Sequence, residues 1–369
     1  MTDLFVYGTL RHIPLLKIVL GRPADQIDLS VDDLPDHAAM TTLEGPFPLI
    51  AAQSGHDQTG LVLNKLSSLD LERLNFYEGG FDYTLARKTT SKGQGVDVYF
   101  PPLEGVTANG MWDLAQWEAD WSPLTLIAAR EVMSFFGERS AQDIVGMFPM
   151  IRSRAAANLN AQSTKHGHGT LGGRLEIFKK TREYTDFFAL DSYQLQHERF
   201  DGTMTDTLSR AVFIGTDAAI LLPYDPKRDR VLLVEQMRMG PMGRGDPNLW
   251  QLEPIAGRVD AGETPVECAI REAEEEADLQ ITQLESVCEA YPSPGCSTEF
   301  FYIYVGLADL PDDIVGISGL ETENEDIRTH VMSFDALMDL VESQQAANVP
   351  LVTLAYWLAF HRSRLRSLA

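Results

Sequence analysis

Apolar and polar positions along the chain predict both strands and helices. Two apolar runs in "DAAILLPYDPKRDRVLLVEQMRMG", residues 217–240, are joined at an Asp-Pro pair and predict two strands linked by a turn. Residues 113–160 have a helical pattern instead, and residues 161–173, "AQSTKHGHGTLGG", predict a linker because glycine and polar residues dominate them. The expected apolar helical face consists of Leu126, Ile127, Ala129, Val132, Met133 and Phe136.

A strongly acidic helix is predicted within "GRVDAGETPVECAIREAEEEADL", residues 257–279. Thr264, Pro265 and Glu267 have the pattern of an N-cap, a first helical residue and a capping-box partner. The helix should therefore start there and run to about Leu279. Its expected apolar stripe consists of Val266, Ala269, Ile270 and Ala273.

Three carboxylates should share one face of this helix. Glu272, Glu275 and Glu276 stand at i, i+3 and i+4, and no cation follows them on the helix. Like charges at this spacing cost a few tenths of a kcal/mol per pair, and a bound divalent cation would turn that repulsion into attraction. The pattern by itself leaves two interpretations open, a magnesium site and a solvated acidic face.

The wider spacing resembles the Nudix box, the signature of hydrolases that cleave nucleoside diphosphates linked to another group. Gly257 is followed after five residues by Glu263, and after seven more by Arg271-Glu272-Ala273, one further residue, and Glu275-Glu276. One position departs from the signature, because Asp278 stands where the family usually has glycine after the helix. Aspartate tolerates the left-handed conformation, so the turn should survive.

The surroundings of the box resemble the ADP-ribose pyrophosphatase branch of this superfamily, from about residue 172 to the C-terminus. The resemblance rests on Glu235, Gln236 and Arg238 upstream, on "SPG" at 293–295 and Glu299 downstream, and on "ETENEDIR" at 321–328. It implies an α/β/α sandwich around a mixed sheet. It also implies that preceding strands, in 174–184 and 190–202, build a swapped homodimer.

The resemblance also implies a set of site residues and a reaction. Mg²⁺, or Mn²⁺, would be bound by carboxylates, which are hard oxygen ligands. Water would attack one phosphorus of ADP-ribose, or of a related nucleoside diphosphate sugar, and give AMP and ribose 5-phosphate. The implied metal ligands are Ala256 through its carbonyl, Glu272, Glu276 and Glu325; the catalytic positions are Glu323 as base, Glu275 and Arg271; the substrate-binding positions are Arg210, Arg238, Phe187 as an adenine-stacking ring, Ser293, Pro294 and Glu299.

The first third of the chain carries a separate pattern. "LFVYGTLR", residues 4–11, is an apolar strand that runs into a turn formed by Tyr7, Gly8, Thr9 and Leu10, and Glu78 precedes Gly79-Gly80 and a further strand. Residues 1 to about 115 resemble the γ-glutamylcyclotransferase-like family, a mixed β-barrel whose loop binds a γ-glutamyl group and whose glutamate moves protons. The alternative is a domain used only for contact or binding, in which Glu78 is structural.

Composition limits the classes of partner. The chain has 369 residues, 44% of them hydrophobic, which suffices for two domains with buried cores. A net charge of −24 argues against a nucleic-acid or anionic-membrane surface. The three cysteines lack CxxC spacing, and no apolar run approaches membrane-spanning length. A cytosolic protein that binds a small molecule is the expectation.

We therefore expect an α+β protein of two domains. Residues 1–115 form the γ-glutamylcyclotransferase-like domain, 116–171 a helical extension and linker, and 172–369 the Nudix domain. The expected function is a magnesium-dependent diphosphatase for ADP-ribose. Three alternatives stay open: another nucleoside diphosphate sugar as substrate, a primary cyclotransferase activity, and a non-hydrolysing sensor of an ADP-ribose-like metabolite.

Overall fold

The chain folds into two compact units, Met1–Thr164 and Lys165–Ala369. The structure is a computed structural model, and it describes residues 2–79, 83–102, 106–163, 172–312, 314, 316–318 and 326–367. Within these ranges no helix has both the length and the apolar composition needed to cross a membrane. Each unit has its own hydrophobic core, as expected for a chain of this length.

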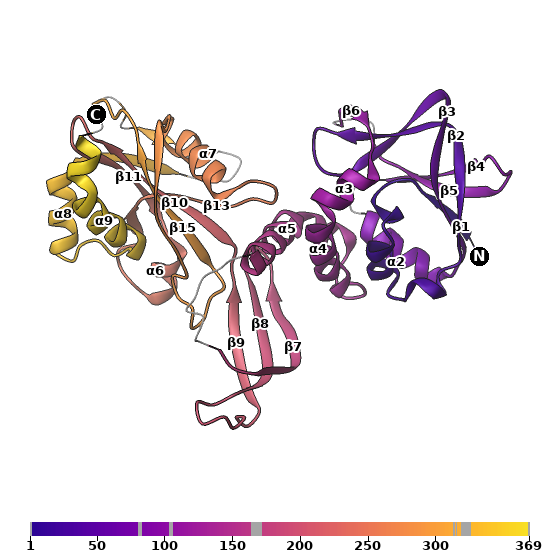
Figure 1. Ribbon diagram of the computed structural model, residues 1–369, viewed down its shortest axis with the longest axis horizontal. Coiled ribbons are helices and arrows are strands. Elements are labelled where there is room, and N and C mark those ends of the chain that lie inside the picture. Colours follow the sequence, from indigo (N-terminus) through magenta and orange to yellow (C-terminus); the bar gives the residue numbers. More distant parts are fainter. Residues whose placement is uncertain are drawn as a thin grey trace. The chain divides into compact units, whose positions relative to one another are not determined.

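The N-terminal unit contains a curled, mixed sheet (Figure 1). Its strand order is β4-β5-β1-β3-β2-β6; β1 pairs with β5 in parallel, and every other pairing is antiparallel. The turn after β4 reaches β2, where the Ser91 amide donates to the Asp33 carbonyl at 2.9 Å. This hydrogen bond connects the turn after β4 to β2 across the curled sheet. The predicted mixed, barrel-like class is confirmed. The strands are β1 (Thr2–Val6), β2 (Leu29–Thr42), β3 (Pro48–Leu66), β4 (Thr84–Thr89), β5 (Gly95–Phe100) and β6 (Ala108–Met111).

Helices complete this unit. The expected apolar face within 113–160 is buried at Ala129, Val132 and Met133 and half-buried at its other three positions. Arg154 of α5 and Glu131 of α4 form a buried ion pair at 2.6 Å, which ties these two helices together. The helices are η1 (Thr9–Arg11), α1 (Ile13–Leu20), η2 (Ala24–Gln26), α2 (Ser68–Glu78), α3 (Leu114–Asp120), α4 (Ser122–Ser134) and α5 (Ala141–Ser163).

The C-terminal unit is a sandwich around an eight-stranded sheet (Figure 1). The main strand order is β14-β15-β10-β11-β17-β16, with β13 paired to β10 and β12 paired to β11. One core cluster lies between the sheet and α7, and another lies between the sheet and α8 and α9, so the predicted α/β/α class is confirmed. The elements are β10 (Asp217–Asp225), β11 (Arg230–Met237), α6 (Met239–Arg244), β12 (Trp250–Glu253), β13 (Ile255–Arg258), α7 (Pro265–Ala277), β14 (Gln283–Ala290), β15 (Phe300–Leu307), β16 (Ile317–Ser318), β17 (Ile327–Ser333), α8 (Phe334–Glu342) and α9 (Val349–Arg366).

A second sheet precedes the sandwich. Strands β7 (Leu175–Thr185), β8 (Ala189–His197) and β9 (Leu208–Ile214) form an antiparallel three-stranded sheet in chain order. This confirms the strands predicted after the linker. Its β9 end is joined to the 291–299 loop, because the Phe213 amide donates to the Cys296 carbonyl at 2.8 Å. The sheet also exposes several large apolar side chains, among them Leu175, Ile177 and Phe178.

Candidate functional site

Helix α7 begins and ends where its sequence predicts. The Thr264 hydroxyl accepts from the Glu267 amide at 3.2 Å, and the Glu267 carboxylate accepts from the Thr264 amide at 2.7 Å, which completes the capping box. At the other end Asp278 has φ 49° and ψ 41°, the left-handed conformation expected of the glycine position. The departure from the family signature therefore leaves the turn intact.

The buried face of α7 differs from the predicted stripe. Ala269 and Ala273 are buried as expected, but Val266 and Ile270 remain 43% and 42% exposed. The helix instead turns Glu276 inward, where only 2% of that residue is exposed. Which face of α7 is buried depends on the close packing of its small residues against the sheet. A count of apolar positions could not predict this orientation. The buried residues are Cys268, Ala269, Ala273, Glu276 and Ala277.

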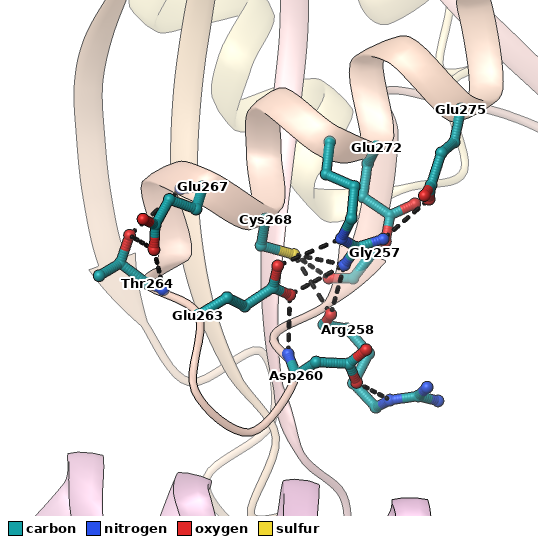
Figure 2. A network of polar contacts seen from close by, with 10 residues as sticks. Gly257, Arg258, Asp260, Glu263, Thr264, Glu267, Cys268, Glu272 and Glu275 are labelled. Atoms are coloured by element: carbon teal, nitrogen blue, oxygen red, sulfur yellow. Dashed lines mark hydrogen bonds and ion pairs between the residues drawn. The ribbon is translucent and has the colours of Figure 1, made fainter. Parts of the chain in front are cut away.

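Arg271 is the centre of a half-buried ion-pair network that links α7 to residues 257–263, and its partners Glu263, Glu272 and Glu275 are labelled in Figure 2. Its guanidinium lies 2.8 Å from carboxylate oxygens of Glu263, Glu272 and Glu275, and it also donates to the Arg258 carbonyl at 3.3 Å. No cation follows Glu272, Glu275 and Glu276 on the helix, but Arg271, which precedes them, turns back onto Glu272 and Glu275. Burial opposes ionisation of Glu263, but hydrogen bonds from Arg271 and the Asp260 amide keep its pKa below the usual range.

Gly257 brings the strand β13 against α7. A Cβ atom added to Gly257 would lie 1.8 Å from the Glu272 carboxylate, so only glycine fits this position. The adjacent Ala256 carbonyl, the Glu272 carboxylate and the buried Glu276 carboxylate are oxygen donors of the kind that Mg²⁺ takes. By the chemistry of their oxygen atoms, these residues suit a divalent cation.

The proposed metal set and base stay predictions. In the described ranges no three His, Cys, Asp or Glu side chains stand together as a metal-ligand group, and Glu272 and Glu275 contact Arg271. Glu323 and Glu325 lie outside the described residues.

Phe187 reaches the box from the loop between β7 and β8. The guanidinium carbon of Arg258 lies 5.7 Å from the centre of the Phe187 ring, and Phe188 packs edge-on against that ring at 4.9 Å. Phe187 is 54% exposed, so part of this residue remains accessible to solvent. The predicted stacking residue and the box are thus brought together.

The two predicted substrate arginines are differently placed. Arg238 pairs with the buried Glu253 at 2.7 Å, and Asn348 donates to the other carboxylate oxygen of Glu253 at 2.9 Å. Arg210 is exposed on β9 and donates to the carbonyl of its neighbour Ser209. Arg238 therefore has a visible structural role, and a ligand role for either arginine stays a prediction.

The 291–299 loop holds the other predicted substrate residues. Ser293 and Pro294 are exposed, and the Ser293 hydroxyl contacts the Cys296 thiol at 3.2 Å. Glu299 is half-buried and packs against Gly215. A Cβ atom added to Gly215 would lie 2.4 Å from the Cγ atom of Glu299. Burial raises the pKa of Glu299. A partly desolvated carboxyl thus stands at the junction of this loop and β9, and its contact with substrate stays a prediction.

The N-terminal unit holds the second predicted site. Tyr7 and Leu10 are buried, and Thr9 begins the η1 turn. A Cβ on Gly8 would lie 2.4 Å from the Pro48 ring, so the close packing against Pro48 requires glycine. The loop is therefore packed closely at the end of β1.

Glu78 ends α2 among tyrosines. Burial raises the pKa of Glu78 to about 7, and its charge contributes to raising the pKa values of Tyr7, Tyr77, Tyr83 and Tyr99. The structure thus brings the predicted glutamate into electrostatic reach of the predicted loop. The sequence analysis missed three of these tyrosines. Tyr77 and Tyr83 flank Glu78 in "YEGGFDY" and could have been noticed, whereas nothing in the sequence connects Tyr99 to it.

Comparisons with known proteins identify a family for each part of the chain. A family model described as "NUDIX domain" matches residues 215–352, and one described as "Gamma-glutamyl cyclotransferase, AIG2-like" matches residues 4–119. The ADP-ribose pyrophosphatase of Escherichia coli (strain K12) is 38% identical over 193 residues, which cover 52% of this chain and 91% of that protein. The ADP-ribose pyrophosphatase of Haemophilus influenzae is 35% identical over 196 residues, 52% of this chain and 89% of that protein.

A more distant relative is named for another substrate. The GDP-mannose pyrophosphatase of Yersinia pestis is 32% identical over 138 residues, which cover 37% of this chain and 69% of that protein. The box, its sandwich and these relatives lead to one conclusion: the chain belongs to the Nudix hydrolases, and it carries a γ-glutamylcyclotransferase-like domain at its N-terminus.

Proposed function

We propose that the C-terminal unit is a divalent-metal-dependent diphosphatase that hydrolyses ADP-ribose to AMP and ribose 5-phosphate. The observation that carries this proposal is the intact box on α7, with Gly257 packed against Glu272, in a unit similar to ADP-ribose pyrophosphatases over nearly their whole length. A related nucleoside diphosphate sugar is the alternative substrate, because one relative is a GDP-mannose pyrophosphatase.

Each box residue has a role in this proposal. Glu272, Glu276, the Ala256 carbonyl and Glu325 would hold Mg²⁺ or Mn²⁺. When bound, such an ion neutralises phosphoryl charge and lowers the pKa of water. Arg271 keeps the Glu272 and Glu275 carboxylates oriented, and Glu323 would take the proton of the attacking water.

Phe187, Arg210 and Arg238 would bind the nucleotide, and the 291–299 loop, with Ser293, Pro294 and Glu299, would line the rest of the site. The partly exposed ring of Phe187, beside Arg258, supports stacking of the substrate's adenine on Phe187. Two further elements of the proposal are a homodimer joined through the exposed apolar surface of β7–β9 and a cytosolic location.

A substrate panel tests this proposal. The full chain with Mg²⁺ should give AMP from ADP-ribose, with a kcat/KM above that for GDP-mannose, and a chelator should stop the reaction. Products are separated by chromatography. Equal turnover of ADP-ribose in the presence of the chelator would refute the metal requirement, and a higher kcat/KM for GDP-mannose would refute the substrate.

A second activity is favoured by the position of Glu78. We propose that the N-terminal unit closes γ-glutamyl compounds to 5-oxoproline: the substrate's α-amine attacks its own γ-carbonyl and expels an amine. Glu78 would take the ammonium proton and return one to the leaving group. A pKa of about 7 lies close to that of an α-amine, near 8, which makes Glu78 an effective acceptor.

Glu78→Gln should abolish 5-oxoproline release, and the wild-type rate should rise with pH through about 7. The sign follows from the raised pKa, because the carboxyl is protonated, and cannot accept a proton, below that value. Liquid chromatography of 5-oxoproline checks this over a panel of γ-glutamyl amines, with chelator present to silence the other unit.

Stability provides the control for this prediction. Because the folded pKa of Glu78 exceeds the unfolded one, its stabilising contribution is complete below about 4.5 and is lost as the pH rises through about 7. Relative to Glu78→Gln, the free energy of unfolding should fall by at most about 3 kcal/mol over this range. The predicted stability loss without any 5-oxoproline would leave Glu78 a structural residue.

A further inference from the structure

Residues 257–279 contain one arginine besides Arg271, which is Arg258. Its side chain extends away from α7 (Figure 2). Its main chain is fixed to the catalytic helix, because the Arg258 carbonyl accepts from Arg271 at 3.3 Å and from the Cys268 thiol at 3.2 Å. The residue before it, Gly257, touches the Glu272 carboxylate. Arg258 is thus anchored within the proposed catalytic site.

The guanidinium of Arg258 lies over Phe187, the residue proposed to stack on the nucleobase, while its main chain contacts α7. Its central carbon is 5.7 Å from the centre of the Phe187 ring. In a nucleoside diphosphate one ribose separates the base from the first phosphate. With the nucleobase on Phe187, the nucleoside-side phosphate would lie one ribose away, within reach of a guanidinium that contacts the same ring.

The acidic character of residues 257–279 favours a cation at this point. Residues 257–279 contain eight carboxylates and two arginines. Arg271 is engaged by three of the glutamates. Arg258 is paired with Asp260 at 3.1 Å, and their side chains are 26% and 53% exposed. Because more than half of the Asp260 side chain is in contact with solvent, a phosphate can compete with it for the guanidinium.

We propose that Arg258 is a substrate-binding residue that holds the nucleoside-side phosphate, exchanging its bond to Asp260 for bonds to phosphate oxygens. The proposal rests on the proposed function, because it takes the substrate to be a nucleoside diphosphate. The planar guanidinium can donate two parallel hydrogen bonds to one phosphate, which a lysine cannot do.

Binding of AMP and of adenosine by the full chain, measured by calorimetry with chelator present, tests the proposal. Arg258→Gln should raise the Kd for AMP roughly tenfold or more, since a charge-assisted hydrogen bond is lost, and should leave adenosine binding unchanged. Asp260→Asn should bind AMP as tightly as the wild type or more tightly. Arg244→Gln is the matched control, because Arg244 is 83% exposed and pairs with Asp246 at 3.6 Å.

Three results would overturn the assignment. Equal losses for AMP and adenosine would place Arg258 against the base, and an Asp260→Asn loss as large as that of Arg258→Gln would make their ion pair a loop-positioning contact. If the wild type hydrolyses ADP-ribose and Arg258→Gln binds AMP normally, this inference alone fails. If the AMP-specific loss appears but no ADP-ribose is hydrolysed with Mg²⁺, the proposed substrate fails and the phosphate contact stands.

Discussion

Glu276→Gln is expected to lower kcat for ADP-ribose hydrolysis by about 10² to 10⁴, since metal-assisted charge stabilisation contributes several kcal/mol. Glu276 is the most deeply buried carboxylate of α7. Glutamine keeps its shape and removes the charge that would hold the cation. Because glutamine keeps the volume of the side chain, the metal-free variant should keep the fold of the metal-free wild type.

Glu274→Gln is the matched control for this experiment. Glu274 lies two residues away on the same helix and is exposed, so the substitution removes the same charge from the element without changing the buried face. Steady-state rates at saturating Mg²⁺, together with urea unfolding of all three proteins, separate the two effects. Full activity of Glu276→Gln, or an equal loss in Glu274→Gln, would contradict a specific role for Glu276.

Gly257→Ala is the second change with a large expected effect. The new methyl group would lie 1.8 Å from one oxygen of Glu272 and 2.3 Å from its Cγ, so the Glu272 side chain must leave its position or α7 must move from the sheet. We expect kcat to fall by about 10²-fold because a misplaced ligand loses near-attack geometry. Overpacking of this kind costs about 1 to 3 kcal/mol in the free energy of unfolding.

The control for crowding is Gly240→Ala in α6. A Cβ at Gly240 meets no atom within 4 Å, so this variant should keep its activity and lose no stability. Steady-state rates of ADP-ribose hydrolysis and urea denaturation are measured for Gly257→Ala and Gly240→Ala. If Gly257→Ala keeps wild-type activity and stability, the Glu272 carboxylate does not need its position against β13, and its predicted role as a metal ligand is wrong.

Local chemistry explains what the sequence by itself determined. The start of helix α7 could be predicted because Thr264 and Glu267, three residues apart, form its capping box. Its end could be predicted because Asp278 alone adopts the left-handed conformation of the turn. The Asp-Pro turn between β10 and β11 is equally local. The box spacing and the "YGTL" turn identified both domain families, since each depends on residues close together in the chain.

Only the tertiary structure decided how these elements face one another. The roll of α7 depends on its packing against the sheet, so Val266 and Ile270 remain exposed while Glu276 is buried. Tyr99 approaches Glu78, and Phe187 approaches Arg258, across separations of 21 and 71 residues that no local pattern encodes. Side-chain neighbours of this kind follow from strand order and helix packing, which the whole fold sets, and they determine the pKa of Glu78 and the position of the Arg258 cation.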